Sequence, residues 1–130
     1  AEGAVFISVK DSDKTGVIEA ARELINLGFT LVATSGTAAH LEAEGLPVSS
    51  INKVNEGQPH IVDAMINGDI QLVFNTTEGA TSIADSASIR RTAVARKIPY
   101  YTTLAASMAS VRAITSMKSR EISVRALQSA

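Results

Sequence analysis

The sequence predicts an α/β fold, a Rossmann-like three-layer α/β/α sandwich around a five-stranded parallel sheet. Short apolar runs alternate five times with segments of helical periodicity, and the connections between them are short. Such alternation is typical of parallel strands joined by right-handed crossovers, with helices on both faces of the sheet. We therefore expect the strand order 3-2-1-4-5 and a single domain over residues 1–130.

The first half of the chain contains three predicted strands and two predicted helices. The strands are expected at residues 4–9, 29–33 and 47–51, and the first of them is a short apolar run. The first helix ends before Gly28 and follows three candidate N-caps, Asp11, Ser12 and Asp13. The second helix is expected at residues 37–43 and ends before Gly45.

The second half continues the alternation. Pro59 can open a third helix that ends before Gly68, because proline fits the first helical turn. Further strands are expected at residues 70–74 and 99–101. Between them, Asp85 is expected to cap a fourth helix. The last helix is expected at residues 104–114, and residues 121–127 fit no single pattern.

The composition describes a globular protein and excludes several classes of function. Hydrophobic residues make up 45% of the chain and charged residues 19%, which excludes a disordered chain. The net charge is −1, and cationic pairs occur only at residues 90–91 and 96–97, so we expect no nucleic-acid partner. No apolar run approaches the ~20 residues that a membrane span needs, so we expect no membrane partner.

The chain contains no cysteine, which excludes disulfides and thiolate metal sites and is consistent with a reducing compartment. No signal peptide precedes the first predicted strand, so we expect a cytoplasmic protein. The chain also begins without methionine. We expect it to be excised from a longer protein, and simple trimming is the plainer alternative.

Polar residues gather where the predicted strands end, and in such sheets ligands bind at that edge. They comprise a hydroxyl-rich turn before the second helix, another turn after the fourth strand and two lysines, namely Thr34, Ser35, Gly36, Thr37, Asn75, Thr76, Thr77, Lys14 and Lys53. Helix capping, ordinary turns and solvated lysines would explain each residue singly. Together they offer backbone N–H donors, the positive end of a helix and compensating charge, which predicts a site for a phosphorylated small ligand.

Other kinds of site find little support. No glycine-rich dinucleotide or Walker motif occurs, so dinucleotides and triphosphates are not expected. His40 and His60 have no matching metal ligands, and His60 with Asp63 is more simply a hydrogen-bonded pair. No nucleophile elbow is present. We therefore expect neither a metal, nor a cofactor, nor a catalytic residue in this domain.

At the strand ends the sequence resembles one known family, the methylglyoxal-synthase-like domain at the C-terminal end of carbamoyl-phosphate synthetase large chains. The similarity spans nearly the whole chain and rests on residues 8–14, 33–38, 52–61, 74–77 and 101–104. The stretch Asn-Lys-Val-Asn-Glu-Gly-Gln-Pro-His-Ile at 52–61 is the most specific part. The Thr-Ser-Gly-Thr turn at 34–37 is shared by the wider superfamily.

The resemblance implies a methylglyoxal-synthase-like fold and a regulatory role without catalysis. In this family the domain binds UMP as an inhibitor and, in some members, IMP as an activator. The matching motifs place effector contacts on Lys14, Thr34, Thr37, Lys53, Asn75 and Thr77. The family also implies that Tyr100 and Thr102 face an ornithine site beside the neighbouring synthetase domain. With Thr103 they are expected to couple the domains, and packing and helix capping are the plainer alternatives.

The parent enzyme implied by the resemblance is an ATP-dependent ligase that makes carbamoyl phosphate from glutamine and bicarbonate, for pyrimidine and arginine biosynthesis. It would use ATP and divalent or monovalent metal ions on parts absent from this chain. The implied partners are UMP or IMP, the remaining synthetase domains and the glutaminase small subunit. Self-association through this domain is a further option.

Three other functions stay open. A methylglyoxal synthase, a lyase acting on dihydroxyacetone phosphate, needs a carboxylate base. Gln58 stands where that family has an aspartate after the third strand, which leaves Glu56 as a stand-in. The histidine and aspartate of that family after the fourth strand are also missing, unless Asp85 is recruited. An IMP cyclohydrolase domain matches residues 13–16 and 46–48 but lacks its Lys-Thr-Leu-His-Pro segment. An interaction module would show an exposed apolar patch.

Overall fold

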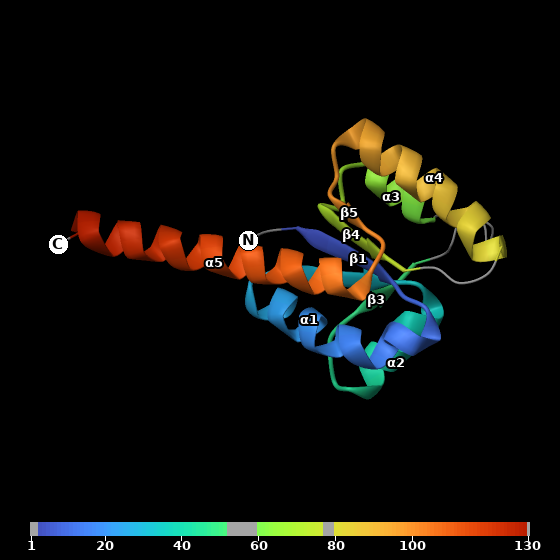
Figure 1. Cartoon of the computed structure of the whole chain (residues 1–130), viewed down its shortest axis with the longest axis horizontal. Helices are drawn as coiled ribbons and strands as arrows, with labels where there is room; N and C mark the ends of the chain where they lie inside the picture. The colour runs from blue at the N-terminus through green and yellow to red at the C-terminus, as the bar shows by residue number, and fades with distance from the viewer. Residues whose placement is uncertain (1–2, 52–59, 77–79, 130) are drawn as a thin grey trace.

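The central feature of the structure is a five-stranded parallel sheet in the order β3-β2-β1-β4-β5 (Figure 1). This computed structural model describes residues 3–51, 60–76 and 80–129. The strands are β1 (Ala4–Ser8), β2 (Thr30–Ala33), β3 (Ser49–Ser50), β4 (Leu72–Asn75) and β5 (Tyr100–Tyr101). The predicted strand order is confirmed, and β3 is shorter than the strand predicted at residues 47–51.

Helices cover both faces of the sheet, which confirms the predicted three-layer sandwich (Figure 1). One face carries α1 (Lys14–Asn26), α2 (Ser35–Ala43) and α5 (Leu104–Ser129), and the other carries α3 (Ile61–Ile66) and α4 (Ala80–Arg96). A short 3-10 helix, η1 (Asp11–Asp13), leads into α1.

Alternate side chains of the central strands feed two separate cores. In β1, Val5 and Ile7 pack on the α1 face, whereas Phe6 packs on the α3 face. In β4, Phe74 points to the first face and Val73 to the second. All of these side chains are fully buried. Because successive side chains of a strand point to opposite sides, a strand buried on both faces must be apolar throughout.

Two helices differ from their sequence predictions. The expectation that Asp85 caps the fourth helix is wrong, because α4 already begins at Ala80 and Asp85 lies inside it. The last helix does not end near residue 114 but continues to Ser129. No glycine or proline occurs between Leu104 and Ser129, so nothing in the local sequence ends this helix. The third helix starts at Ile61, while Pro59 lies outside the described residues.

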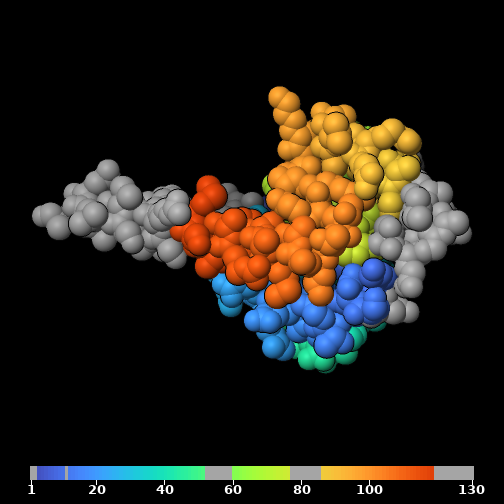
Figure 2. All heavy atoms as spheres, viewed as in Figure 1, coloured from blue at the N-terminus to red at the C-terminus, as the bar shows by residue number. Residues whose placement is uncertain are grey.

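Helices α1 and α5 pack closely along one face (Figure 2). Gly16 permits the approach, because a Cβ atom at this position would lie 2.5 Å from Cδ2 of Leu104. Near the other end of the contact, Lys118 Nζ donates to the carbonyl oxygen of Leu27 at 3.1 Å. The start of α5 is thereby held beside the start of α1, at the carboxyl edge of the sheet.

No helix in the described part of the chain has both the length and the apolar character that a membrane crossing requires.

A matched pair of valines tests the burial pattern. Val73 is fully buried in β4, whereas Val94 on α4 is 75% exposed. Val73→Ala should lower the free energy of unfolding by about 2–3 kcal/mol, because it removes two buried methyl groups and leaves a cavity. Val94→Ala should change it by less than about 0.5 kcal/mol. Urea denaturation of the three proteins measures both values, and equal losses at the two positions would contradict the structure.

Candidate functional site

The carboxyl ends of β1, β2 and β4 lie side by side, and most of the predicted site residues gather there. Ser8, the last residue of β1, is paired in register with Asn75, the last residue of β4. On the other side, β1 pairs with β2, which ends one residue before Thr34. The chain leaves β1 toward β2 and later returns on the opposite side as β4, so this edge is the switch point of the sheet.

Thr34 occupies the N-cap position of α2 but does not cap it with its side chain. Its hydroxyl donates to Oγ of Ser8 at 3.2 Å, and its carbonyl accepts the N–H of Ala38 at 2.8 Å. The interpretation of Thr34 as a side-chain cap is therefore wrong. Because the hydroxyl is directed to β1, it ties the start of α2 to the central strand.

Lys14 begins α1 and lies close to the first turn of α2. A Cβ atom built on Gly36 would be only 3.4 Å from Lys14 Nζ. Ser35 and Gly36 are exposed at this turn. The N-terminus of a helix carries partial positive charge, so the lysine brings a second positive charge to the same place. An anion between them would be stabilised by both.

Two buried threonines bind the backbone that follows β1. Oγ1 of Thr37 accepts the N–H of Val9 at 3.3 Å, and Oγ1 of Thr76 accepts the N–H of Lys10 at 3.0 Å. A hydroxyl group that accepts one hydrogen bond still has its own hydrogen to donate. Each threonine can therefore support the fold and also donate to an acceptor at the strand ends.

Ser8 is a site residue that the sequence analysis did not select. Its Oγ accepts from Thr34, and its carbonyl accepts the N–H of Thr76 at 2.9 Å. Ser8 thereby joins Thr34, which follows β2, to Thr76, which follows β4. The available signal was a single polar residue at the end of an apolar strand, which by itself has no specific meaning.

Asn75 is buried, and its carboxamide contacts two hydroxyl groups. Nδ2 lies 2.9 Å from Oγ of Ser86 on α4 and 2.8 Å from Oη of Tyr100 on β5. Ser86 was not among the predicted site residues, and Tyr100 was predicted to face a neighbouring domain. Ser86 lies 11 residues beyond Asn75, on α4, so no local sequence motif could indicate this contact.

The three residues assigned to interdomain coupling have different surroundings. Tyr100 is half-buried, whereas Thr102 and Thr103 are exposed. Oγ1 of Thr103 accepts the N–H of Ala106 at 3.1 Å, which is a helix cap for α5. The capping interpretation therefore describes the Thr103 side chain, while a coupling role for these residues stays a prediction.

Some predicted site residues lie outside the described residues, namely Lys53, Glu56, Gln58 and Thr77. Within the described ranges, no three His, Cys, Asp or Glu side chains come close enough to hold a metal ion. The carboxylate of Asp63 accepts the backbone N–H of His60 at 3.2 Å, and Nδ1 of His60 lies 3.6 Å from Oδ2 of Asp63. His60 is the N-cap residue of α3, and Asp63 lies in the first turn of this helix.

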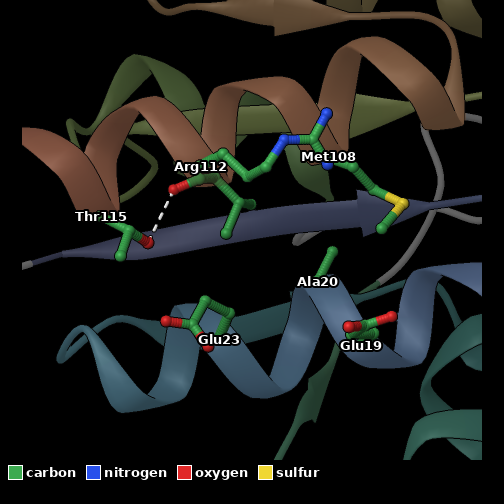
Figure 3. A pocket seen from close by; sticks show the side chains of 7 residues that line it. Glu19, Ala20, Glu23, Met108, Arg112 and Thr115 are labelled. Atoms are coloured by element: carbon green, nitrogen blue, oxygen red, sulfur yellow. Dashed lines mark hydrogen bonds between the residues drawn. The ribbon is translucent and has the colours of Figure 1, made fainter.

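A separate hollow of about 220 Å³ lies between α1 and α5 (Figure 3). Its floor is apolar, with Ala20, Met108 and Val111, and Glu19, Glu23, Arg112 and Thr115 complete the lining. None of the residues predicted to bind phosphate lines it. The hydroxyl of Thr115 donates to the carbonyl oxygen of Val111 within α5 at 2.9 Å, a bond that belongs to the helix.

Comparisons with known proteins agree on one kind of domain. A family model described as "MGS-like domain" matches residues 16–102. The chain is 48% identical over 127 residues to the carbamoyl phosphate synthase large chain of Brucella suis, covering 98% of this chain and 11% of that one. The corresponding protein of Halomonas eurihalina is 53% identical over 127 residues, covering 98% and 12%. That of Pseudomonas syringae pv. tomato is 55% identical over 112 residues, covering 86% and 10%.

The chain thus spans 10–12% of the length of these curated relatives. Among solved structures, a methylglyoxal synthase from Elizabethkingia anophelis superposes with a TM-score of 0.67 at 15% identity. The match covers 85% of this chain and 77% of that protein. At this level of identity the likeness concerns the fold alone.

Replacing Thr37 tests the bond that holds the end of β1. Thr37→Val keeps the shape of the side chain but leaves the buried N–H of Val9 without its acceptor, so the free energy of unfolding should fall by about 1–3 kcal/mol. Thr115→Val is the matched control, because the carbonyl of Val111 belongs to the helix interior and keeps its helical partner. It should cost less than about 0.5 kcal/mol. Thermal or urea denaturation measures both, and an unchanged stability of Thr37→Val would show that Val9 N–H has another acceptor.

Proposed function

The chain belongs to the MGS-like domain family, and from this premise we propose that it is the effector-binding domain of a carbamoyl phosphate synthase large chain. In this role it binds a phosphorylated nucleotide and changes the activity of the rest of the enzyme. The identity to the large chains extends over 86–98% of this chain, which supports the assignment to such a protein. The chain is then one part of a longer cytoplasmic enzyme.

The observation that carries this proposal is the meeting of Lys14 with the first turn of α2 at the switch point of the sheet. Both features favour the binding of an anion at this place. The hydroxyl groups of Thr37 and Thr76 flank the same strand ends and can donate to phosphate oxygens. A phosphate monoester fits this set of donors and charges.

The nucleotide is UMP or IMP on the evidence of family resemblance, with the phosphate bound by Lys14, by the first turn of α2 and by the threonine hydroxyls. Lys53 and Thr77 are expected to add further contacts. The sugar and base contact other loops, and those contacts determine which nucleotide is preferred.

Regulation requires that the nucleotide bind two states of the whole enzyme with different affinities, and the coupling is then reciprocal. The partners in this scheme are the remaining synthetase domains and the glutaminase small subunit. Tyr100, Thr102 and Thr103 lie at the end of β5 and the start of α5, where they can face a neighbouring domain near an ornithine site. The domain itself has no catalytic residue or cofactor in this proposal, and ATP and metal ions act elsewhere in the parent enzyme.

Isothermal titration calorimetry with UMP, IMP, uridine and inosine tests the phosphate site. At least one nucleotide should bind, and its nucleoside should bind far more weakly. Lys14→Met should weaken nucleotide binding by about ten- to a hundredfold, because a hydrogen bond to a charged group contributes roughly 1.5–3 kcal/mol. We expect a similar loss for Lys53→Ala.

Lys97→Met is the matched control, since Lys97 is exposed beyond the C-terminal end of α4 and the substitution removes the same charge. It should leave the affinity within about twofold, as expected for a surface change outside the site. Equal affinities for nucleotide and nucleoside would remove phosphate recognition from the proposal.

Methylglyoxal synthase activity is an alternative function that the sequence leaves open. We expect the purified chain to form no methylglyoxal from dihydroxyacetone phosphate above the rate in buffer, because a glutamine replaces the aspartate of that family. A coupled colorimetric assay measures the product. Sustained turnover that Glu56→Gln abolishes would establish the lyase and overturn the regulatory assignment.

A further inference from the structure

Tyr100 lies beside the candidate effector site and contacts Asn75, one of its residues. Its hydroxyl oxygen lies 2.8 Å from Nδ2 of Asn75, whose side chain is only 3% exposed. The same nitrogen lies 2.9 Å from Oγ of Ser86. An amide nitrogen has two hydrogens, so these two bonds use both of them. The carboxamide of Asn75 is therefore held in one orientation by two hydroxyl groups.

The position of Tyr100 is itself fixed from two sides. Its backbone pairs with Val73 in the register of β4 and β5. On the outer side, the guanidinium carbon of Arg90 lies 5.6 Å from the centre of the Tyr100 ring, a cation–π contact from α4. A ring held by a strand and by an arginine can place its hydroxyl group reproducibly.

We propose that Tyr100 is a positioning residue of the effector site, which orients the carboxamide of Asn75 for the bound nucleotide. The proposal rests on the proposed function and gives Tyr100 a second role in it. Tyr100 then contributes to nucleotide affinity as well as facing a neighbouring domain. A displacement of its ring at the surface of the domain changes the orientation of Asn75 inside the site.

Tyr100→Phe removes the hydroxyl but keeps the ring that contacts Arg90. It should weaken binding of UMP or IMP by about three- to tenfold, the loss expected for one neutral hydrogen bond. Tyr101→Phe is the matched control, because Tyr101 is the next residue of the same strand and packs edge-on against Phe74 on the opposite face, with ring centres 5.9 Å apart. This control should stay within about twofold of the wild type.

If Tyr100 affects nucleotide binding through Asn75, the losses of affinity in a double-mutant cycle will be non-additive. In the Asn75→Ala background, Tyr100→Phe should cause no further loss of affinity. In the ligand-free domain, the side-chain amide signals of Asn75 in a ¹⁵N–¹H NMR spectrum should move in Tyr100→Phe and stay in place in Tyr101→Phe. A purely structural role of Tyr100 would lower the melting temperature without this non-additivity.

The outcomes separate this inference from the proposed function. If the wild-type domain binds neither nucleotide, the proposed function fails and the positioning role fails with it. If the wild type binds a nucleotide and Tyr100→Phe binds it equally well, only the positioning role is overturned. Equal losses in the wild-type and Asn75→Ala backgrounds would also overturn it, as would unmoved Asn75 signals.

Discussion

The hydrogen bonds at the end of β1 determine the arrangement of everything around the candidate site. The Ser8 carbonyl accepts from the backbone of Thr76, and its hydroxyl accepts from Thr34. The next two backbone N–H groups, of Val9 and Lys10, donate to Thr37 and Thr76. A buried backbone donor without a partner is costly, so the bond to the buried N–H of Val9 stabilises the fold. Because β1 lies between β2 and β4, satisfying its last groups also fixes the turns on both sides.

The same side chains can therefore serve stability and recognition. A hydroxyl that accepts a backbone hydrogen cannot rotate freely, so its remaining donor is oriented before a ligand arrives. Preorganised donors spare a ligand the entropic cost of ordering them. Asn75 is likewise held between Ser86 and Tyr100 in the absence of any ligand, and because both of its amide hydrogens are used, its side-chain oxygen is the group that it can offer to a ligand. A rigid, polar strand edge of this kind suits a small anionic molecule better than an extended macromolecular surface.

The layers and strand order could be predicted because they follow from local patterns and from the handedness of crossovers. The gathering of Lys14, Thr34, Thr37, Asn75 and Thr76 followed from the rule that parallel strands share one carboxyl edge. Individual bonds could not be predicted, because a threonine at an N-cap position can bond its own helix or a neighbouring strand. The contact of Asn75 with Tyr100 depends on the register of β4 with β5, and its contact with Ser86 depends on where α4 begins. The sequence pattern predicted the start of α4 at the wrong residue.

The edges of the described sheet have a consequence for how the domain behaves at high concentration. The outer strands, β3 and β5, are each only two residues long. An exposed strand edge pairs with a strand of another molecule when it offers a long row of open backbone groups. Edges this short offer few such groups, and Pro99 before β5 has no N–H to donate. Intermolecular β-pairing, a common start of aggregation, therefore has little template here, although the inner strands β1 and β4 are strongly apolar.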